Sequence, residues 1–424
     1  MDKSLLKRAA VQSFALMVTV VTSSFALQQY QAVSISANDG IQKSDITSYD
    51  QAGMNALSEA SIPLNPDQES AVTKSVTLAT NLAELEAQMD DSIKEKLGEN
   101  YLAIKKQEAD TSSIELKDIY INHSIQLDFT GLLENNIGSD KILRVRGRNF
   151  YAGEPKYTET ISQESEEDGS TKEVVTRDYG SDLCHMITSA AIQDTATNQN
   201  HFLLLLELDS VYAYSVYEDA NYYYIDLRQP SKVYDRILVI DAGHGGKDAG
   251  ALSKDKSLYE KNINLGIVLQ LKELLDQENI KVYYTRTGDD KVFLRPRVTL
   301  ANSVDCDYFI SIHCNSNEVT YPNGTEILYY DNEFKGVPTQ KLATLFSDEI
   351  SKSVELKKNG IVQKHMEDIF IMDNAQVPTI LIEIGYMSNT MDLNYLSNPE
   401  KQKEIAKGIF NGIMRVYKDL PVTR

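Results

Sequence analysis

Apolar runs of strand length recur over residues 233–424, separated by segments in which apolar residues follow helical spacing. The runs at 237–240, 307–315 and 379–389 have the continuous apolar character of strands buried in a parallel sheet. The last segment, 399–419, carries apolar residues at core spacing, which predicts a helix packed on that sheet. We therefore expect an α/β domain with a mostly parallel, open sheet flanked by helices.

Residues 113–232 show a different pattern, with short runs bounded by turn residues. Polar and apolar positions alternate in segments such as ILRVRGRNFY, which is typical of antiparallel strands. The acid-rich stretch 164–169 has the composition of an exposed hairpin tip. This part of the chain is predicted to be a β-rich domain that precedes the α/β domain.

Residues 28–112 are predicted to form a linker. The stretch 36–75 is rich in Ser, Asn, Asp, Gln and Ala and poor in aromatic residues, which disfavours a packed core. Within 78–106, apolar residues recur every three or four positions and predict a helix. That helix is either a coiled-coil or docking element, or a helix packed on its neighbouring domain.

The first 27 residues have the features of an export signal. Lys3, Lys7 and Arg8 precede an uncharged stretch over 9–27, and small residues flank Phe25 where a signal peptidase would cleave. The apolar part is shorter than the ~20 residues that a membrane-spanning helix prefers. A cleaved signal peptide is therefore favoured over an N-terminal membrane anchor, and both predict an exported protein.

The chain has 42 basic and 62 acidic residues and a formal charge of −20. This charge argues against nucleic acid as a partner, and against attraction to an anionic membrane or wall polymer by charge alone. Three cysteines are too few for a disulfide framework.

The segment RILVIDAGHGGKDAG joins a predicted strand to a glycine-rich turn that contains His244. A dinucleotide-binding motif would need glycine at Asp248, and a phosphate-binding loop would need Ser or Thr directly after Lys247. Both nucleotide-binding motifs are therefore excluded. The turn instead presents His244 at the end of a strand, at the rim of the sheet.

Three further residues with chemically useful side chains lie near the ends of predicted elements. His313 ends one strand, Glu383 lies near the end of another, and Glu260 lies just before a helix. Ligands bind outside the carboxyl ends of strands in an open parallel sheet, so these residues can meet there. Two imidazoles and one carboxylate, with water in a fourth position, are the usual ligands of a hydrolytic zinc site, and a second carboxylate can move protons.

Each of these residues alone has an ordinary explanation. The two histidines could be hydrogen-bonded turn or strand-end residues, and Glu260 could stabilise the positive end of the following helix. Glu383 is harder to explain in this way, because a carboxylate buried among apolar neighbours is costly without a partner. The convergence of all four residues on one edge of the sheet favours a metal centre.

Several segments also occur, in the same order and spacing, in a known family. The chain from about Val233 to its end resembles the zinc-dependent N-acetylmuramoyl-L-alanine amidases of bacterial cell-wall turnover. The matching segments are VIDAGHGGKDAGA, LYEKNINL, VYYTRTGDD, RPRVTLAN, FISIHCNS and ILIEIGYMSN. The departures, Ala242 in place of a frequent proline and Cys314 in place of a frequent alanine, remove no functional group.

The resemblance implies one zinc ion bound by His244, Glu260 and His313, with Glu383 as the catalytic carboxylate. It implies hydrolysis of the amide bond between the lactyl group of N-acetylmuramic acid and the L-alanine of the stem peptide. Peptidoglycan would then be the partner, and the enzyme would be extracellular or associated with the cell wall. Division, sporulation and lysis all remain open as its biological setting.

The segment YYYIDLRQP, directly before the catalytic domain, is similar to the end of the AMIN-type β domains that precede many of these amidases. This similarity implies binding to peptidoglycan or localisation at the septum, and a structural spacer is the alternative. We assign 1–27 as signal peptide or anchor, 28–112 as linker, 113–232 as a β-rich AMIN-like domain and 233–424 as the catalytic domain.

Two other functions fit parts of the pattern. A zinc carboxypeptidase or other peptidase shares a two-His, one-Glu site but needs a cation for the substrate carboxylate. Arg286 is the candidate for that cation, although pairing of Arg286 with a nearby acid is favoured. A wall-binding scaffold with an inert site is the non-enzymatic alternative, and retention of all four site residues weighs against it.

Some relatives carry a helical insertion that plugs the zinc site until an activator removes it. Here the segment between His313 and Glu383 is predicted to contain the strand GTEILYY, a helix over 339–354, a short turn and two further strands, the second in DIFIMD. This leaves no room for a plug in the catalytic domain. We therefore expect an open cleft and no requirement for an activator protein.

Overall fold

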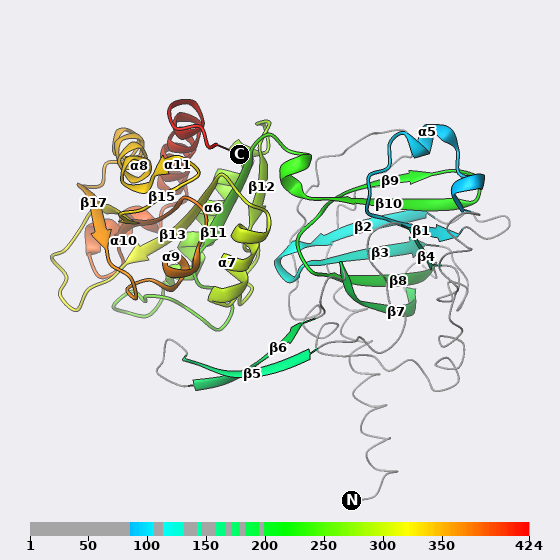
Figure 1. The fold of residues 1–424 in the computed structure, drawn as a ribbon. Helices are drawn as coiled ribbons and strands as arrows, with labels where there is room; N and C mark the ends of the chain where they lie inside the picture. Colours follow the sequence, from blue (N-terminus) through cyan, green and yellow to red (C-terminus); the bar gives the residue numbers. More distant parts are fainter. Residues whose placement is uncertain are drawn as a thin grey trace, which may run out of the picture. The chain divides into compact units, whose positions relative to one another are not determined.

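The computed structural model describes residues 85–105, 113–130, 142–145, 158–165, 171–178, 183–194 and 199–423 (Figure 1). Within these residues the chain divides after Arg228 into two compact units. The predicted export signal at 1–27 lies outside the described residues. Among the helices that are described, none combines the length and the apolar character needed to cross a membrane.

The first unit is built from antiparallel strands. One sheet has the order β4-β1-β10-β9, the other has the order β2-β3-β8-β7, and a separate hairpin pairs β5 with β6. The strands are β1 (Tyr101–Lys105), β2 (Ser113–Ile119), β3 (Ser124–Thr130), β4 (Ile142–Val145), β5 (Thr158–Ser165), β6 (Thr171–Asp178), β7 (Cys184–Asp194), β8 (Gln199–Leu208), β9 (Ala213–Glu218) and β10 (Tyr222–Arg228). A short 3-10 helix occupies Tyr120–Asn122, and another, Pro230–Lys232, follows directly after the division between the units.

The core of this unit consists of apolar side chains from both sheets. Leu102 and Ile225 come from the first sheet, Leu127 and Leu204 come from the second, and all four are fully buried in one cluster. Each sheet therefore buries one face against the other, as the alternation in the sequence predicts. The prediction of a β-rich part upstream of the α/β domain is confirmed.

The prediction of one helix over 78–106 is wrong in the described residues. After a helical segment at 85–88 and the short helix α5 (Asp91–Lys94), β1 joins the first sheet between β4 and β10. Pairing with two neighbouring strands outweighs the helical preference of the local sequence, which is a weak determinant. The β-rich unit therefore begins before residue 113, and the predicted linker extends too far.

The apolar stripe upstream of β1 still packs against the sheet. Leu85, Met89 and Ile93 are buried in a cluster with Tyr101 and Tyr224. These tyrosines lie on the face of the first sheet that points away from the core between the sheets. The helical turns therefore cover that outer face.

The second unit contains a six-stranded sheet of order β12-β11-β13-β18-β14-β17. In this sheet β14 is antiparallel to β18, and every other neighbouring pair is parallel. The mostly parallel, open sheet is therefore confirmed. Its strands are β11 (Ile237–Ala242), β12 (Lys281–Tyr284), β13 (Tyr308–Asn315), β14 (Thr325–Tyr330), β17 (Lys358–Lys364) and β18 (Thr379–Tyr386), and the short strands β15 (Glu333–Phe334) and β16 (Val337–Pro338) pair separately.

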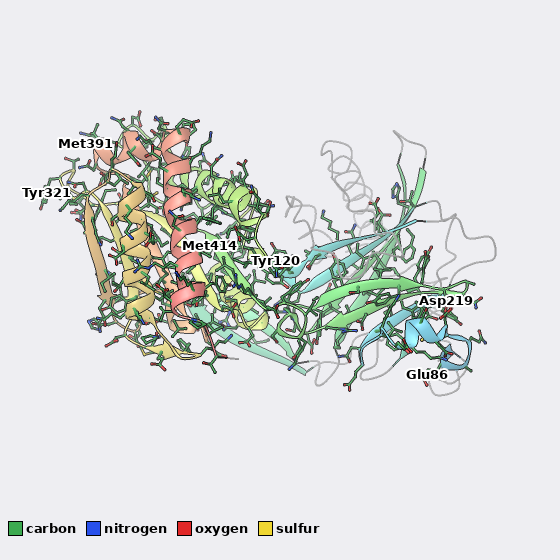
Figure 2. All side chains as sticks on the ribbon, turned by 90° about the horizontal axis from the view of Figure 1, so that it is seen from above. Glu86, Tyr120, Asp219, Tyr321, Met391 and Met414 are labelled. Carbon is green, nitrogen blue, oxygen red and sulfur yellow. The ribbon has the colours of Figure 1, made fainter. Side chains whose placement is uncertain are left out.

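Helices flank this sheet. On one side, α6 (Glu260–Leu275), α8 (Thr339–Ser353) and α11 (Pro399–Asp419) form a layer in which α11 packs against both α6 and α8 (Figures 1 and 2). On the other, α7 (Leu294–Ser303) packs with α9 (Phe370–Asn374). The steps from β11 to β12 and from β12 to β13 run in opposite directions across the sheet, so right-handed connections put α6 and α7 on opposite faces. The short helix α10 (Thr390–Leu396) follows β18.

Two predicted elements of this unit have different outcomes. The last helix, α11, spans the predicted residues, and its N-terminus is capped by Asn398 with proline at the first helical position. The prediction of a strand in DIFIMD is wrong, because Phe370–Asn374 forms α9. Ile371 and Met372 are buried in that helix, and a short apolar run does not distinguish a strand from a buried helical turn.

Candidate metal centre

The four candidate site residues lie at one edge of the six-stranded sheet. His244 follows β11, His313 lies near the end of β13, Glu383 lies in β18, and Glu260 is the first residue of α6. Because β11, β13 and β18 are parallel, their carboxyl ends meet at this edge. His313 and Glu383 are direct partners in the register of β13 and β18.

Glycines let the turn after β11 pass close to the other site residues. A Cβ atom at Gly243 would lie 2.2 Å from the His313 ring, and one at Gly250 would lie 2.5 Å from Glu260 Oε2. His244 itself has a φ of 61°, a left-handed conformation that is unfavourable for a residue with a side chain. The surrounding structure must therefore hold this turn in place.

Two buried arginines hold the turn. Arg286, which follows β12, donates to the carbonyl oxygens of Ala242 and Gly243 at 2.9 Å each. Arg297 of α7 donates to the carbonyl oxygens of Ala242 and His244 at 2.8 and 2.9 Å. Three consecutive carbonyl groups are therefore fixed by two guanidinium groups, which stabilises the left-handed backbone of His244.

Arg286 does not have the partner that the sequence predicts. Its remaining hydrogen bonds go to the carbonyl oxygens of Gly288 and Lys261, so all four of its acceptors are backbone groups rather than a carboxylate. The predicted acidic partner of Arg286 is therefore wrong. The guanidinium group of Arg286 instead donates its hydrogen bonds to carbonyl groups of a tightly turned backbone.

Glu260 connects the turn, α6 and β13. Its Oε1 accepts from the Cys314 N–H at 3.0 Å and lies 3.0 Å from His313 Nδ1. Its Oε2 accepts from the Ala251 N–H at 2.8 Å and lies 3.2 Å from His244 Nε2. The side chain is 4% exposed, so this carboxylate is buried between the two imidazoles.

The three predicted ligands come together in the structure. One ligand atom from each of His244, Glu260 and His313 lies within 4.8 Å of the other two. The two imidazole rings meet edge to face, with centroids 4.9 Å apart. The histidine side chains are 22% and 20% exposed, so the cluster can be reached from solvent.

The charges of these groups depend on one another. Burial raises the pKa of Glu260, but hydrogen bonds and charge interactions with His244 and His313 more than offset this and hold the pKa well below its usual range. Burial lowers the pKa of His244, but Glu260 and Asp248 raise it to about 9. The carboxylate is therefore anionic at neutral pH, as a metal ligand must be.

Asp248 is a site residue that the sequence prediction lacks. Its Oδ2 lies 2.9 Å from His244 Nδ1, while His244 Nε2 faces Glu260. A carboxylate in this position fixes the tautomer of a ligand histidine and directs its other ring nitrogen toward the metal. The signal in the sequence is the four-residue spacing between His244 and Asp248 within one glycine-rich turn.

Glu383 lies next to His313 in the sheet but outside the three-residue cluster. Its Oε2 is buried and has no hydrogen-bond partner among the described residues. Burial is the main cause that raises the pKa of Glu383 to about 7; the histidines oppose this effect, and Glu260 and Glu326 add to it. A carboxyl group with a pKa near neutrality can both accept and donate a proton.

A family model described as N-acetylmuramoyl-L-alanine amidase matches residues 238–415. The chain is also 33% identical over 182 residues to the N-acetylmuramoyl-L-alanine amidase CwlM of Bacillus licheniformis, and this match covers 42% of the chain and 68% of that protein. The chain belongs to the N-acetylmuramoyl-L-alanine amidases. The family predicted from the sequence motifs is confirmed, and this amidase is an enzyme that hydrolyses peptidoglycan.

Further relatives match the same part of the amidase. The germination-specific N-acetylmuramoyl-L-alanine amidase of Bacillus subtilis (strain 168) is 29% identical over 198 residues, covering 43% of this chain and 81% of that protein. Among solved structures, the chain is similar to the catalytic domain of CwlV, an N-acetylmuramoyl-L-alanine amidase from Bacillus (Paenibacillus) polymyxa var. colistinus. The two are 30% identical with a TM-score of 0.40, and the match covers 43% of this chain and 98% of the CwlV domain. The β-rich unit lies outside the family match, so its AMIN-type identity stays a prediction.

Proposed function

We propose that this amidase uses one zinc ion, bound by His244, Glu260 and His313, to hydrolyse the amide bond between the lactyl group of N-acetylmuramic acid and L-alanine. Glu383 transfers the proton in this reaction. The observation that supports the proposal most strongly is the convergence of three ligand atoms within 4.8 Å of one another, near a buried oxygen of Glu383 that has no partner in the described part of the chain.

The donor set of the cluster fits zinc. Two imidazole nitrogens and one carboxylate oxygen leave a fourth tetrahedral position for water, which is the usual composition of a hydrolytic zinc site. Asp248 supplies the outer carboxylate that ligand histidines usually have. Other divalent ions that accept nitrogen and oxygen donors are compatible with the same residues, so analysis of the bound metal is part of the test.

Glu383 is suited to carry a proton between the two halves of the reaction. Zinc, when bound, would lower the pKa of a coordinated water and polarise the scissile carbonyl group. Glu383 would accept a proton from the attacking water and return it to the nitrogen of L-alanine as the amide bond breaks. The products are a lactyl carboxylate on the glycan and a stem peptide with a free L-alanine amino group.

The surroundings of the cluster favour this reaction over the alternatives. A carboxypeptidase needs a free cation for the terminal carboxylate of its substrate, but the Arg286 residue is only 3% exposed and its donors are used by backbone carbonyl groups. An inert scaffold would not require both histidines, Glu260 and Glu383. Hydrolysis of the amide next to muramic acid is therefore the reaction that the site supports best.

We also propose that the enzyme works without an activator protein. The whole stretch between His313 and Glu383 is described and consists of β14 to α9, with α8 packed on α11 and β14. The exposure of the two histidine side chains, 22% and 20%, further supports access from solvent. Activity of the full chain on peptidoglycan without added proteins is the expected result.

The proposals for the N-terminal half rest on the sequence and on the location of the substrate. Peptidoglycan lies outside the cytoplasmic membrane, so an enzyme that acts on it must be exported. This supports a signal peptide or membrane anchor at 1–27. Binding of peptidoglycan by the AMIN-like region that we assigned to 113–232 also remains a proposal.

Digestion of purified peptidoglycan with the full chain, followed by mass spectrometry, tests the proposed reaction. Amidase action releases stem peptides with free L-alanine amino termini. Carboxypeptidase action would shorten the stem peptides at the other end, and an inert scaffold would leave the digest unchanged. Metal analysis of the same preparation should find one zinc ion per chain, and removal of that ion should abolish the release.

A further inference from the structure

Three exposed apolar side chains lie on two segments at the edge of the sheet that carries the candidate metal centre. Val319, Tyr321 and Met391 are 42%, 78% and 81% exposed. The first two belong to the loop 316–324 between β13 and β14, and Met391, in the first turn of α10, belongs to the segment 387–391 after β18. We call these two segments the rim loops. Figure 2 labels Tyr321 and Met391 close together at one end of the second unit.

Hydrogen bonds join the two rim loops. Asn389 Nδ2 donates to the Thr320 carbonyl oxygen at 2.8 Å, and the Asn317 N–H donates to Ser388 Oγ at 3.1 Å. Thr320 precedes Tyr321, and Asn389 lies two residues before Met391. The two most exposed apolar side chains of the rim loops therefore start from adjacent backbone segments.

A buried carboxylate fixes the base of both rim loops. Asp392 is 4% exposed, and its Oδ2 accepts from the Gly324 N–H at 2.7 Å and from the Tyr386 N–H at 2.9 Å. The first of these groups ends one rim loop and the second directly precedes the other. The loops are therefore held in one arrangement, and a ligand that binds there would lose little free energy in ordering them.

The rim loops begin close to the site residues. Asn315 pairs with Tyr386 in the sheet, immediately beyond the pair formed by His313 and Glu383. At about 3.3 Å per residue along a strand, the rim loops start roughly 10 Å beyond His313 and roughly 13 Å beyond Glu383. A polymer whose amide bond lies at the metal centre can therefore reach these loops.

The composition of the rim loops indicates the chemistry of their ligand. The segments SNEVTYPNG and MSNTM contain mainly amide, hydroxyl and apolar side chains, one acidic residue, Glu318, and no lysine or arginine. Peptidoglycan stem peptides carry carboxylates, for which the rim loops offer no cation. The glycan strand instead offers hydroxyl and acetamido groups for hydrogen bonds, together with the apolar faces of its sugar rings.

We propose that Tyr321 and Met391 form a subsite for the glycan strand, next to the muramic acid whose amide bond is cleaved. The tyrosine ring packs against the apolar face of a sugar, and the methionine contacts acetamido methyl groups, so that both lose exposed apolar area on binding. The asparagine and threonine side chains of the rim loops supply hydrogen bonds. This inference rests on the proposed function, because it takes the same polymer as the ligand.

The absence of tryptophan from the chain allows a direct test. In the full chain, Tyr321→Trp introduces a single tryptophan as a fluorophore in the rim loops. The control, Met366→Trp, introduces a single tryptophan at the opposite edge of the sheet, beyond β17, where Met366 is 74% exposed. The probe is glycan strands from which the stem peptides have been removed. Saturable emission changes in Tyr321→Trp, absent in Met366→Trp, are the expected result. Adding Met391→Ala to Tyr321→Trp should weaken the apparent affinity several-fold.

Two results of this binding measurement would overturn the subsite. One is no emission change in Tyr321→Trp, and the other is a change caused by free stem peptide but not by the glycan. Because this measurement requires neither zinc nor hydrolysis, it is independent of the proposed reaction.

In the active enzyme, Tyr321→Ala should raise KM for long-strand peptidoglycan roughly tenfold at unchanged kcat, because binding that is equal in the ground state and the transition state is lost. A fall in kcat at constant KM would instead assign Tyr321 to the chemistry and reject the subsite.

Discussion

The side chains of the metal centre fit together because glycine occupies the positions where the backbone passes closest to them. A Cβ atom at Gly250 would lie 2.5 Å from Glu260 Oε2 and 2.6 Å from His244 Cδ2. Gly250→Ala should therefore displace two of the three ligand residues and weaken zinc binding by at least about tenfold. Competition with a chromophoric chelator would measure the change.

Gly360→Ala is the matched control for this substitution. Gly360 also has a left-handed backbone, with a φ of 94°, but no atom lies within 4 Å of its Cβ position. The control should lose some stability through backbone strain and keep its zinc affinity. Equal losses of zinc affinity in both variants would mean that the close contact at Gly250 is not what shapes the site.

The meeting of His244, His313 and Glu383 could be predicted because each lies at the carboxyl end of a strand with a buried, parallel pattern. The roles of Asp248 and Arg286 could not be predicted in the same way. Both depend on the direction of hydrogen bonds in the turn after β11, and that direction follows from the left-handed conformation of His244. A sequence pattern indicates where a turn occurs but not which way its carbonyl groups point.

At the level of elements, a buried ion pair joins β11 to α7 near the metal centre. The Asp241 and Arg297 side chains are 1% and 3% exposed, and Asp241 also accepts from the hydroxyl groups of Thr285 and Ser311 at 2.6 Å each. Burial raises the pKa of Asp241, but Arg297 and the other nearby donors more than offset this and lower it to about 2. The folded state therefore holds Asp241 ionised more strongly than the unfolded state does.

This ion pair predicts a specific pH dependence of stability. A pKa that is lower in the folded state gives a contribution that is complete above about pH 4 and disappears as the pH falls toward 2. From the shift of Asp241, that contribution is roughly 2 kcal/mol. The difference in unfolding free energy between wild type and Asp241→Asn should therefore shrink by roughly this amount between about pH 5 and pH 2. Urea unfolding followed by circular dichroism would measure it, and a constant difference would reject the assignment.

The elements that the sequence predicts correctly are those in which the spacing of apolar residues matches the faces that are buried in the structure. In α11 the capping residues and the core spacing agree, and β13 and β18 are mostly apolar because helices lie on both faces of the sheet. The errors occur where tertiary contacts decide. Residues 101–105 follow a helical stripe but pair with β4 and β10, and 370–374 is an apolar run that coils against α7.

On the scale of the whole molecule, the three proposed zinc ligands all lie in the second unit, and the described residues of the β-rich unit contain no comparable cluster. A zinc ion would join the turn after β11 to α6 and β13, whereas the β-rich unit has a separate core. Binding to the folded state alone stabilises it by about 2.7 kcal/mol at a free zinc concentration of about 100 Kd. Chelation should therefore lower the melting temperature of one calorimetric transition by about 5–10 °C and leave the other unchanged. Equal shifts of both transitions, or no shift, would contradict a zinc site confined to this unit.

The organisation of the whole chain could be predicted only in part. The change of pattern from alternating to continuous apolar runs marks the passage from the β-rich unit to the α/β unit, and the division after Arg228 lies close to it. The start of the β-rich unit could not be located in this way. Its first strand, β1, pairs with β10, a partner more than a hundred residues away, and this pairing leaves no local signal.

The proposed reaction depends above all on proton transfer by Glu383 beside bound metal. Glu383→Gln preserves the size of the side chain and leaves His244, Glu260 and His313 in place. This variant should bind one zinc ion per chain but release free L-alanine amino termini from peptidoglycan about 10²–10⁴ times more slowly than wild type. Glu326→Gln changes a neighbouring carboxylate and should stay within about tenfold of wild type. A zinc-loaded Glu383→Gln variant that releases these termini at a rate close to that of wild type would show that Glu383 does not transfer the proton.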